Sequence, residues 1–169
     1  LVADTKETLL DRMKSDSYVR CYTKNNIYTG KHVTTKIWVG DYKAKDKDTF
    51  EKLAESACGI KRIGILRADV DNLGNTFVNG FNRKNSDCTY TTLSRTASLS
   101  RQLSLFFKLY INKILAQGSK NMLGIGGERN IVIVYSGGDD VFFAGAWNDV
   151  IAAAIDLQQA LKKFTQGTL

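Results

Sequence analysis

The clearest hydrophobic pattern lies in the second half of the chain. Apolar residues recur at three- and four-residue steps over residues 93–116, which predicts the longest helix, with one apolar face. That face carries Leu99, Leu103, Phe106, Phe107, Tyr110 and Ile114. Before this helix, residues 60–69 form an almost continuous apolar run that ends in a carboxylate, which is typical of a buried strand.

Two further apolar runs, 131–136 and 141–145, are separated only by the sequence GGDD. A connection this short predicts an antiparallel hairpin. A last helix is expected from Asn148, as its N-cap, to about residue 165. Its predicted apolar face consists of Ile151, Ala154, Ile155, Leu161 and Phe164.

The remaining segments have weaker patterns. Residues 5–14 and 49–57 predict short helices, and residues 18–42, rich in Tyr, Thr, Val and Ile, predict two or three strands. A polar loop at 82–92 and a glycine-rich connection at 118–130 separate the later elements.

The predicted order of elements indicates the fold class. A strand, then helices, then an antiparallel hairpin and a last helix match an α+β, ferredoxin-like palm of the nucleotidyl cyclase and polymerase type. We assign residues 59–169 to this palm, with its fourth strand expected after FTQGTL, and residues 1–58 to a small strand-rich linker subdomain. In such a fold the first strand lies beside the hairpin, so Asp69 can meet the acidic hairpin tip.

Charge and composition narrow the class of partner. The 169 residues include 24 basic and 17 acidic side chains, and the net charge of +7 favours anionic partners such as RNA, DNA or nucleotides. No apolar run reaches the ~18 residues that a membrane helix needs, and no signal peptide opens the chain. Three widely spaced cysteines without a CxxC pair predict no zinc site and a reducing, cytoplasmic location.

The hairpin turn carries two adjacent carboxylates, Asp139 and Asp140. Neighbouring carboxylates repel each other unless a cation lies between them or one takes a proton. Gly137 and Gly138 would give the turn freedom in φ and let a substrate approach the backbone. The alternative is an ordinary hairpin turn that happens to be acidic, since glycine-rich turns are common.

A second acidic feature follows the strand at 60–69. Asp69 and Asp71 are two residues apart and face the same side if the chain stays extended. Residues 70–74, including Val70 and Asn72, then turn into a short helix at 71–81 whose free N–H groups could receive a triphosphate. The alternative makes Asp71 or Asn72 the N-cap of that helix.

Together the two acidic features predict a metal site built from Asp69, Asp139 and Asp140. Hard oxygen ligands suit Mg²⁺ or Mn²⁺, and two such ions can polarise a 3′-hydroxyl nucleophile and the leaving pyrophosphate. The lone histidine, His32, is expected on the surface, and without a second histidine no histidine–aspartate nuclease centre can form. Ser136 lies beside the hairpin and can contact a base, whereas Arg129 is expected simply to end a loop.

Several motifs in order resemble one known family. They are WVGDYK (38–43), RADVDNLG (67–74), TLSRTASLSRQLSLFFKLYINKIL (92–115) and IVYSGGDDVFFAGAWNDV (133–150), within a match from RCYTKNN (20–26) to FTQG (164–167). The chain resembles the large subunit of type III CRISPR interference complexes, of the Csm (III-A) subtype, in its second palm domain.

The resemblance implies synthesis of cyclic oligoadenylates from ATP when the complex binds a matching target RNA. It implies that Asp69 and Asp139 are metal ligands with Asp140 in the same acidic pair, that Gly137 and Gly138 shape the turn, and that Ser136 lies near an adenine. The implied partners are other Csm subunits, guide CRISPR RNA, target RNA and the other palm of the same subunit.

The resemblance does not cover the family's HD nuclease region, first palm or zinc region, so no DNA cleavage is assigned to this chain. The chain alone is expected to be inactive.

Two other functions remain open. One is a stand-alone nucleotidyl cyclase of the GGDEF or class III type, although GGDD lacks the Glu-Phe that would complete GGDEF. The other is a non-catalytic palm that serves as a scaffold for RNA and neighbouring subunits. A scaffold for RNA gains nothing from unpaired carboxylates, because they repel phosphate.

Overall fold

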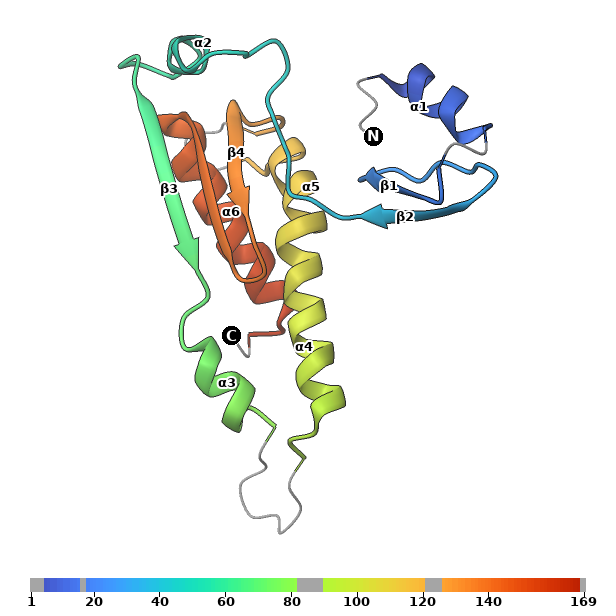
Figure 1. Cartoon of the computed structure of the whole chain (residues 1–169). Coiled ribbons are helices and arrows are strands. Elements are labelled where there is room, and N and C mark those ends of the chain that lie inside the picture. The colour runs from blue at the N-terminus through green and yellow to red at the C-terminus, as the bar shows by residue number, and fades with distance from the viewer. Residues whose placement is uncertain (1–4, 16–17, 82–89, 121–125, 168–169) are drawn as a thin grey trace. The chain divides into compact units, whose positions relative to one another are not determined.

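The computed structural model describes residues 5–15, 18–81, 90–120 and 126–167 (Figure 1). The chain divides into two compact units, Leu1–Val39 and Gly40–Leu169. The domain boundary expected between residues 58 and 59 stays a prediction. Segment 42–44, which lies before that boundary, pairs with the sheet of the second unit. Most of the predicted loop at 82–92 and part of the connection at 118–130 lie outside the described residues. Within the described residues, no helix has both the length and the apolar character to cross a bilayer.

The first unit contains one helix and a two-stranded sheet. Helix α1 (Lys6–Met13) begins after Thr5, whose hydroxyl accepts a hydrogen bond from the Thr8 N–H at 3.2 Å. Strands β1 (Arg20–Lys24) and β2 (Val33–Ile37) pair in parallel. Cys21 and Thr23 are buried, because alternate residues of a strand face the same side. The predicted helix and strands of this region are confirmed.

The second unit is built on a three-stranded antiparallel sheet in the order β3-β5-β4. Its strands are β3 (Ile63–Asp69), β4 (Ile131–Ser136) and β5 (Asp140–Ala146). Its helices are α2 (Phe50–Glu55), α3 (Leu73–Asn79), α4 (Leu93–Leu105), the π-helical segment Phe106–Tyr110, α5 (Ile111–Ala116) and α6 (Trp147–Phe164). The α+β palm predicted from the sequence is confirmed.

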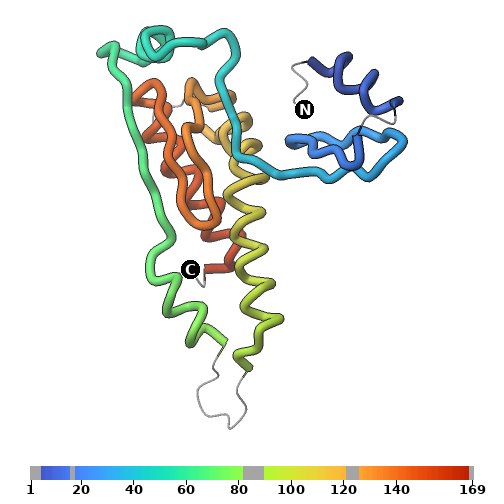
Figure 2. Tube along the Cα trace, viewed as in Figure 1, coloured from blue at the N-terminus to red at the C-terminus, as the bar shows by residue number. Residues whose placement is uncertain are grey.

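One face of the sheet is buried by helices. Ile131, Ile133, Val141 and Phe143 of the sheet join one apolar core with residues of the π-helical segment, α5 and α6. The other face carries the alternate residues of each strand. Figure 2 shows the tip of the β4–β5 hairpin at the same end of the sheet as the C-terminal end of β3.

The outer edge of β4 is paired with a segment that the sequence did not predict as a strand. The Ala44 N–H donates to the Ile131 carbonyl at 3.0 Å, and the Ile133 N–H donates to the Tyr42 carbonyl at 2.9 Å. The Tyr42 hydroxyl also donates to the Arg129 carbonyl at 2.6 Å. These bonds cover a strand edge that would otherwise offer unpaired backbone groups.

The long predicted helix is present at 93–116, but a π-helical segment interrupts its periodicity. The buried face follows Leu103 and Phe107 and continues at Ile111 and Leu115. Tyr110, predicted on that face, is 45% exposed. A π segment contains an extra residue per turn, and so it rotates the following helix relative to the preceding one. The prediction that Leu103 and Phe106 belong to the core is confirmed.

Helix α6 differs from its prediction in its start and in its buried face. It begins directly after Ala146, and Asn148 accepts a hydrogen bond from the Cys58 N–H at 2.9 Å instead of capping its own helix. Ile151, predicted as buried, is 53% exposed, and Val150, Ala153 and Leu157 face the core. Leu161 and Phe164 pack against the core as predicted. The buried face of α6 differs from the predicted one because the helix also buries two carboxylates.

The two buried carboxylates of α6 belong to a charged cluster around Arg129. Arg129 donates from its guanidinium to Asp156 at 2.6 Å and to the Ser119 carbonyl at 2.7 Å, and it lies 4.0 Å from Asp149. Asp149 also accepts two hydrogen bonds from Asn130, at 2.9 and 2.8 Å. Because Asp149 and Asp156 lie two turns apart on α6, their burial turns this face of the helix inward. The prediction that Arg129 simply ends a loop is therefore wrong.

Replacing Arg129 by alanine should destabilise the fold strongly. Asp149 and Asp156 would remain buried without their cation, which costs about 3–5 kcal/mol in the free energy of unfolding. Urea denaturation measures this change, with Arg101→Ala on the exposed side of α4 as the matched control. A loss of less than about 1 kcal/mol for Arg129→Ala would contradict a structural role for the cluster.

The Tyr42 hydroxyl should make folding sensitive to alkaline pH. Burial, and then the charge of Glu128, raise the pKa of Tyr42 from 10.0 to about 12. The unfolded chain therefore loses this proton first, and stability falls as the pH rises from about 10 towards 12, by at most about 1.4 kcal/mol per pH unit. Urea midpoints measured across this range should fall less steeply for Tyr42→Phe than for the parent or for Tyr22→Phe. If the urea midpoints of all three proteins fall equally with pH, Tyr42 is not the group that causes the alkaline loss of stability.

Candidate nucleotide and metal site

Two carboxylates face each other across the β3–β5 pair. Asp69 is the last residue of β3 and is directly paired with Asp140, the first residue of β5. Paired residues of antiparallel strands project to the same face, with Cα atoms about 4.5–5.5 Å apart. That face is the one that the helices leave open, because Ala68 and Val141, next to the two carboxylates, contact the core instead. The predicted meeting of Asp69 with the hairpin follows from this register.

A β-bulge in β4 decides which of its side chains reach the open face. The pairing shifts between Ile133, which is opposite Phe143, and Tyr135, which is opposite Phe142. The extra residue, Val134, places Tyr135 on the same face as Phe142 and Asp140. The Tyr135 hydroxyl and the Asp140 carboxylate lie together beside Gly137, and the charge of Asp140 raises the pKa of Tyr135.

The two glycines of the turn have different surroundings. A Cβ on Gly137 would overlap the Asp140 carboxylate and the Tyr135 hydroxyl, whereas a Cβ on Gly138 would meet only Ser104, at 3.6 Å. Neither glycine has a positive φ, so the predicted need for freedom in φ is wrong. Gly137 is required because the carboxylate and the hydroxyl pass close to its backbone.

The other predicted site residues lie around this pair. Val70 is buried in the core, so only its backbone can reach a ligand, and Asp71 is exposed. Asn72 occupies the N-cap position of α3 with φ of 58°, but its side chain makes no capping hydrogen bond. The Ser136 hydroxyl donates to the Phe107 carbonyl in the π-helical segment, on the face opposite to Asp140. The predicted contact of Ser136 with a base stays a prediction.

Asp69 and Asp140 fit a hard divalent cation through their chemistry and their shared face. Among the described residues, no three His, Cys, Asp or Glu side chains are gathered closely enough to hold a metal ion. The predicted place of Asp139 as a third ligand beside Asp69 and Asp140 stays a prediction. Mg²⁺ is often held by one or two carboxylates, with phosphates of the substrate as further ligands. The donor pair suits such a shared site.

Sequence reasoning missed two residues on the open face, Arg67 and Tyr135. Arg67 is paired with Phe142, which is also paired with Tyr135, so these three side chains form a row beside the two carboxylates. The two-residue spacing between Arg67 and Asp69 could have revealed the arginine. Nothing in the sequence YSGGDD reveals the bulge that directs Tyr135 to this face.

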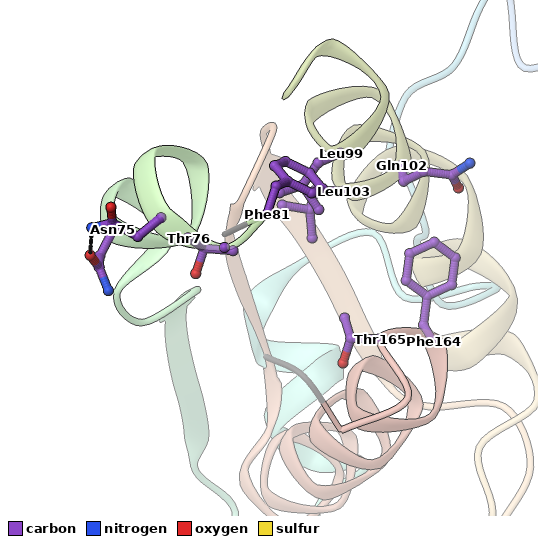
Figure 3. Close-up of a pocket in the computed structure, with 10 residues that line it drawn as sticks. Asn75, Thr76, Phe81, Leu99, Gln102, Leu103, Phe164 and Thr165 are labelled. Atoms are coloured by element: carbon purple, nitrogen blue, oxygen red, sulfur yellow. Dashed lines mark hydrogen bonds between the residues drawn. The ribbon is translucent and has the colours of Figure 1, made fainter. Parts of the chain in front are cut away.

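A pocket of about 560 Å³ opens between α3, α4 and the end of α6 (Figure 3). Its polar groups come from Asn75, Thr76, Asn79, Gln102 and Thr165, and its apolar groups come from Phe81, Leu99, Leu103 and Phe164. The Oγ atom of Ser104, next to Leu103, would lie 3.6 Å from a Cβ on Gly138 of the turn. Amides combined with aromatic rings suit a planar polar ring, and the volume is in the range of small-molecule sites.

The fold and the acidic pair define a palm domain of the nucleotidyl cyclase and polymerase type. The chain belongs to the Cas10/Cmr2 family and contains its second palm domain, because the model of that domain matches residues 62–169.

Relatives named CRISPR system single-strand-specific deoxyribonuclease Cas10/Csm1 (subtype III-A) are similar over most of the chain. The protein of Mycobacterium tuberculosis is 45% identical over 155 residues, which cover 89% of this chain and 18% of that protein. The protein of Streptococcus thermophilus is 38% identical over 166 residues, which cover 97% of this chain and 20% of that protein. The chain thus spans about a fifth of the length of these relatives.

Solved structures of the same family share the fold. A Csm1–Csm4 cassette in complex with cA4 superimposes with a TM-score of 0.72 at 29% identity, over 88% of this chain and 22% of that one. A cassette in complex with one ATP gives a TM-score of 0.71 at 29% identity, with the same coverage. The subcomplex from the type III-A CRISPR-Csm interference complex gives 0.72 at 30% identity, again over 88% of this chain and 22% of that one.

The two turn glycines should respond differently to a single added methyl group. Gly137→Ala should destabilise the fold by about 1 kcal/mol, because the methyl group forces the ends of the Asp140 and Tyr135 side chains to move. Gly138→Ala should change stability by less than about 1 kcal/mol, since its methyl group makes an ordinary contact. Urea denaturation of both variants checks this, and equal effects would contradict the close approach of the Asp140 and Tyr135 side chains to Gly137.

Proposed function

We propose that this chain is the catalytic palm of a type III-A large subunit, which makes cyclic oligoadenylates from ATP when its complex binds target RNA. The observation that carries the proposal is the direct pairing of Asp69 with Asp140 on the open face of the sheet. Relatives about 30% identical are described in complex with ATP, with the linear product pppApA and with cyclic cA3 and cA4.

The reaction joins two nucleotides by a 3′–5′ linkage. The 3′-hydroxyl of one ATP attacks the α-phosphorus of another and gives its proton to solvent, the bond to the β-phosphate breaks, and pyrophosphate leaves. The chemistry that Mg²⁺ or Mn²⁺ would supply when bound is polarisation of the attacking hydroxyl and stabilisation of the leaving group. Asp69 and Asp140 would hold the metal, and Asp139, on the same turn, would add charge beside it. In-line attack also needs the acceptor to be held in place, and we assign that task to the other palm of the subunit.

The pocket between α3 and α4 is our candidate for the base of one nucleotide. Asn79 and Gln102 offer both donors and acceptors to the edge of a base, and Phe81 and Phe164 offer apolar contact. Leu103 and Ser104 are neighbours on α4. Leu103 lines the pocket and Ser104 lies near Gly138, so α4 links the pocket to the acidic hairpin.

The decisive experiment uses the complete subunit assembled with its partners and guide RNA. With target RNA and Mg²⁺ or Mn²⁺, each NTP is offered in turn and the products are identified by mass spectrometry. ATP should give cyclic oligoadenylates, and Asp69→Asn or Asp140→Asn should lower the rate by at least about a hundredfold. Glu55→Gln, on the exposed side of α2, is the control carboxylate and should keep full activity.

Other outcomes distinguish the remaining functions. Robust product from the 169-residue chain alone, without RNA, would contradict the two-palm account and favour a stand-alone cyclase. No product from any NTP by the assembled parent complex would favour the scaffold palm. Full activity of both carboxylate variants would show that the chemistry takes place elsewhere.

A further inference from the structure

Tyr135 is unusually exposed for a large aromatic residue on a strand of the central sheet. It is 53% exposed, on a strand whose core-facing residues Ile131 and Ile133 are buried. Without the bulge at Val134, strict alternation from Ile133 would turn Tyr135 towards the helices and Ser136 towards the open face. The bulge exchanges the two, so the phenol stands on the side of the acidic pair and the smaller serine meets Phe107.

The hydroxyl of Tyr135 has a defined partner. The hydroxyl and the Asp140 Oδ1 atom lie together beside Gly137, since a Cβ on that glycine would overlap each of them. The backbone of Gly137 donates in turn to the Asp140 carbonyl at 2.8 Å, which closes the hairpin turn. Asp140 is thus fixed at its backbone by the turn and at its side chain by the phenol.

We propose that Tyr135 is a positioning residue for Asp140 in the metal site. Its hydroxyl donates to one carboxylate oxygen and leaves the other oxygen directed to the metal that Asp140 shares with Asp69. Partners that orient a ligand in this way commonly contribute about 10- to 100-fold to metal affinity. The inference rests on the proposed function, since it assumes that Asp140 is a metal ligand.

The geometry supports this role over a purely structural one. An exposed phenol that only filled space would not need a bulge, and an exposed ring adds little to the core. The bulge leaves Val134 of β4 unpaired with β5, and it brings Tyr135 to the side of Asp140. Gly137 adds to this, because any larger residue there would separate the hydroxyl from the carboxylate.

The test measures metal binding in the complete subunit, apart from catalysis. Mn²⁺ is titrated in the presence of ATP and the bound ion is followed by electron paramagnetic resonance, for the parent, Tyr135→Phe and Asp140→Asn. Tyr135→Phe keeps the ring and removes only the hydroxyl, and it should weaken Mn²⁺ binding by about 10- to 100-fold. High Mn²⁺ should restore its rate of synthesis, whereas Asp140→Asn should stay inactive. Tyr110→Phe, another exposed tyrosine, is the control and should bind Mn²⁺ like the parent.

The outcomes separate the inference from the proposed function. If Asp140→Asn weakens Mn²⁺ binding and Tyr135→Phe does not, the positioning role is overturned and the metal site stands. If neither variant changes Mn²⁺ binding, the metal site at Asp140 is itself overturned. Thermal unfolding of each variant completes the test, because a loss of stability in Tyr135→Phe without any change in Mn²⁺ affinity would assign the phenol a structural role only.

Discussion

The register of β5 between β3 and β4 determines where the acidic pair and Tyr135 lie. Asp140 is opposite Asp69 on one side of β5, and Phe142 is opposite Tyr135 on the other. A slip of one residue in either pairing would move a carboxylate or the phenol to the helix-covered face. The acidic site is therefore a consequence of strand pairing, and the same pairing buries Val141 and Phe143 in the core.

The two ends of the sheet hold charge in opposite ways. At the start of β4, Asp149 and Asp156 are buried and share the one guanidinium of Arg129, and Asn130 donates further hydrogen bonds to Asp149. At the hairpin tip, Asp69 and Asp140 share an open face, where neighbouring carboxylates repel each other. The buried cluster fixes α6 against the sheet. The open pair remains accessible for chemistry.

Local sequence patterns predicted the elements well, because buried strands and the long helix have strong periodicity. The strand 131–136, the hairpin and the meeting of Asp69 with it are all confirmed. Features that depend on tertiary contacts were missed. The buried face of α6 is chosen by Arg129, far away in sequence, and the bulge at Val134 and the π-helical segment each add a residue that no periodicity in the sequence reveals. The bulge is the reason that Tyr135 was not among the predicted site residues, whereas the two-residue spacing from Asp69 could have revealed Arg67.

The central claim is that Asp69 and Asp140 jointly hold the metal that activates ATP. A crystal structure of the complete subunit soaked with ATP and Mn²⁺ tests it most directly, because anomalous scattering locates manganese without assumptions about the site. The account predicts a manganese peak within about 2.0–2.3 Å of carboxylate oxygens from both residues, with triphosphate oxygens as further ligands. Manganese and ATP bound together at any other part of the palm, with Asp69 and Asp140 free, would contradict it.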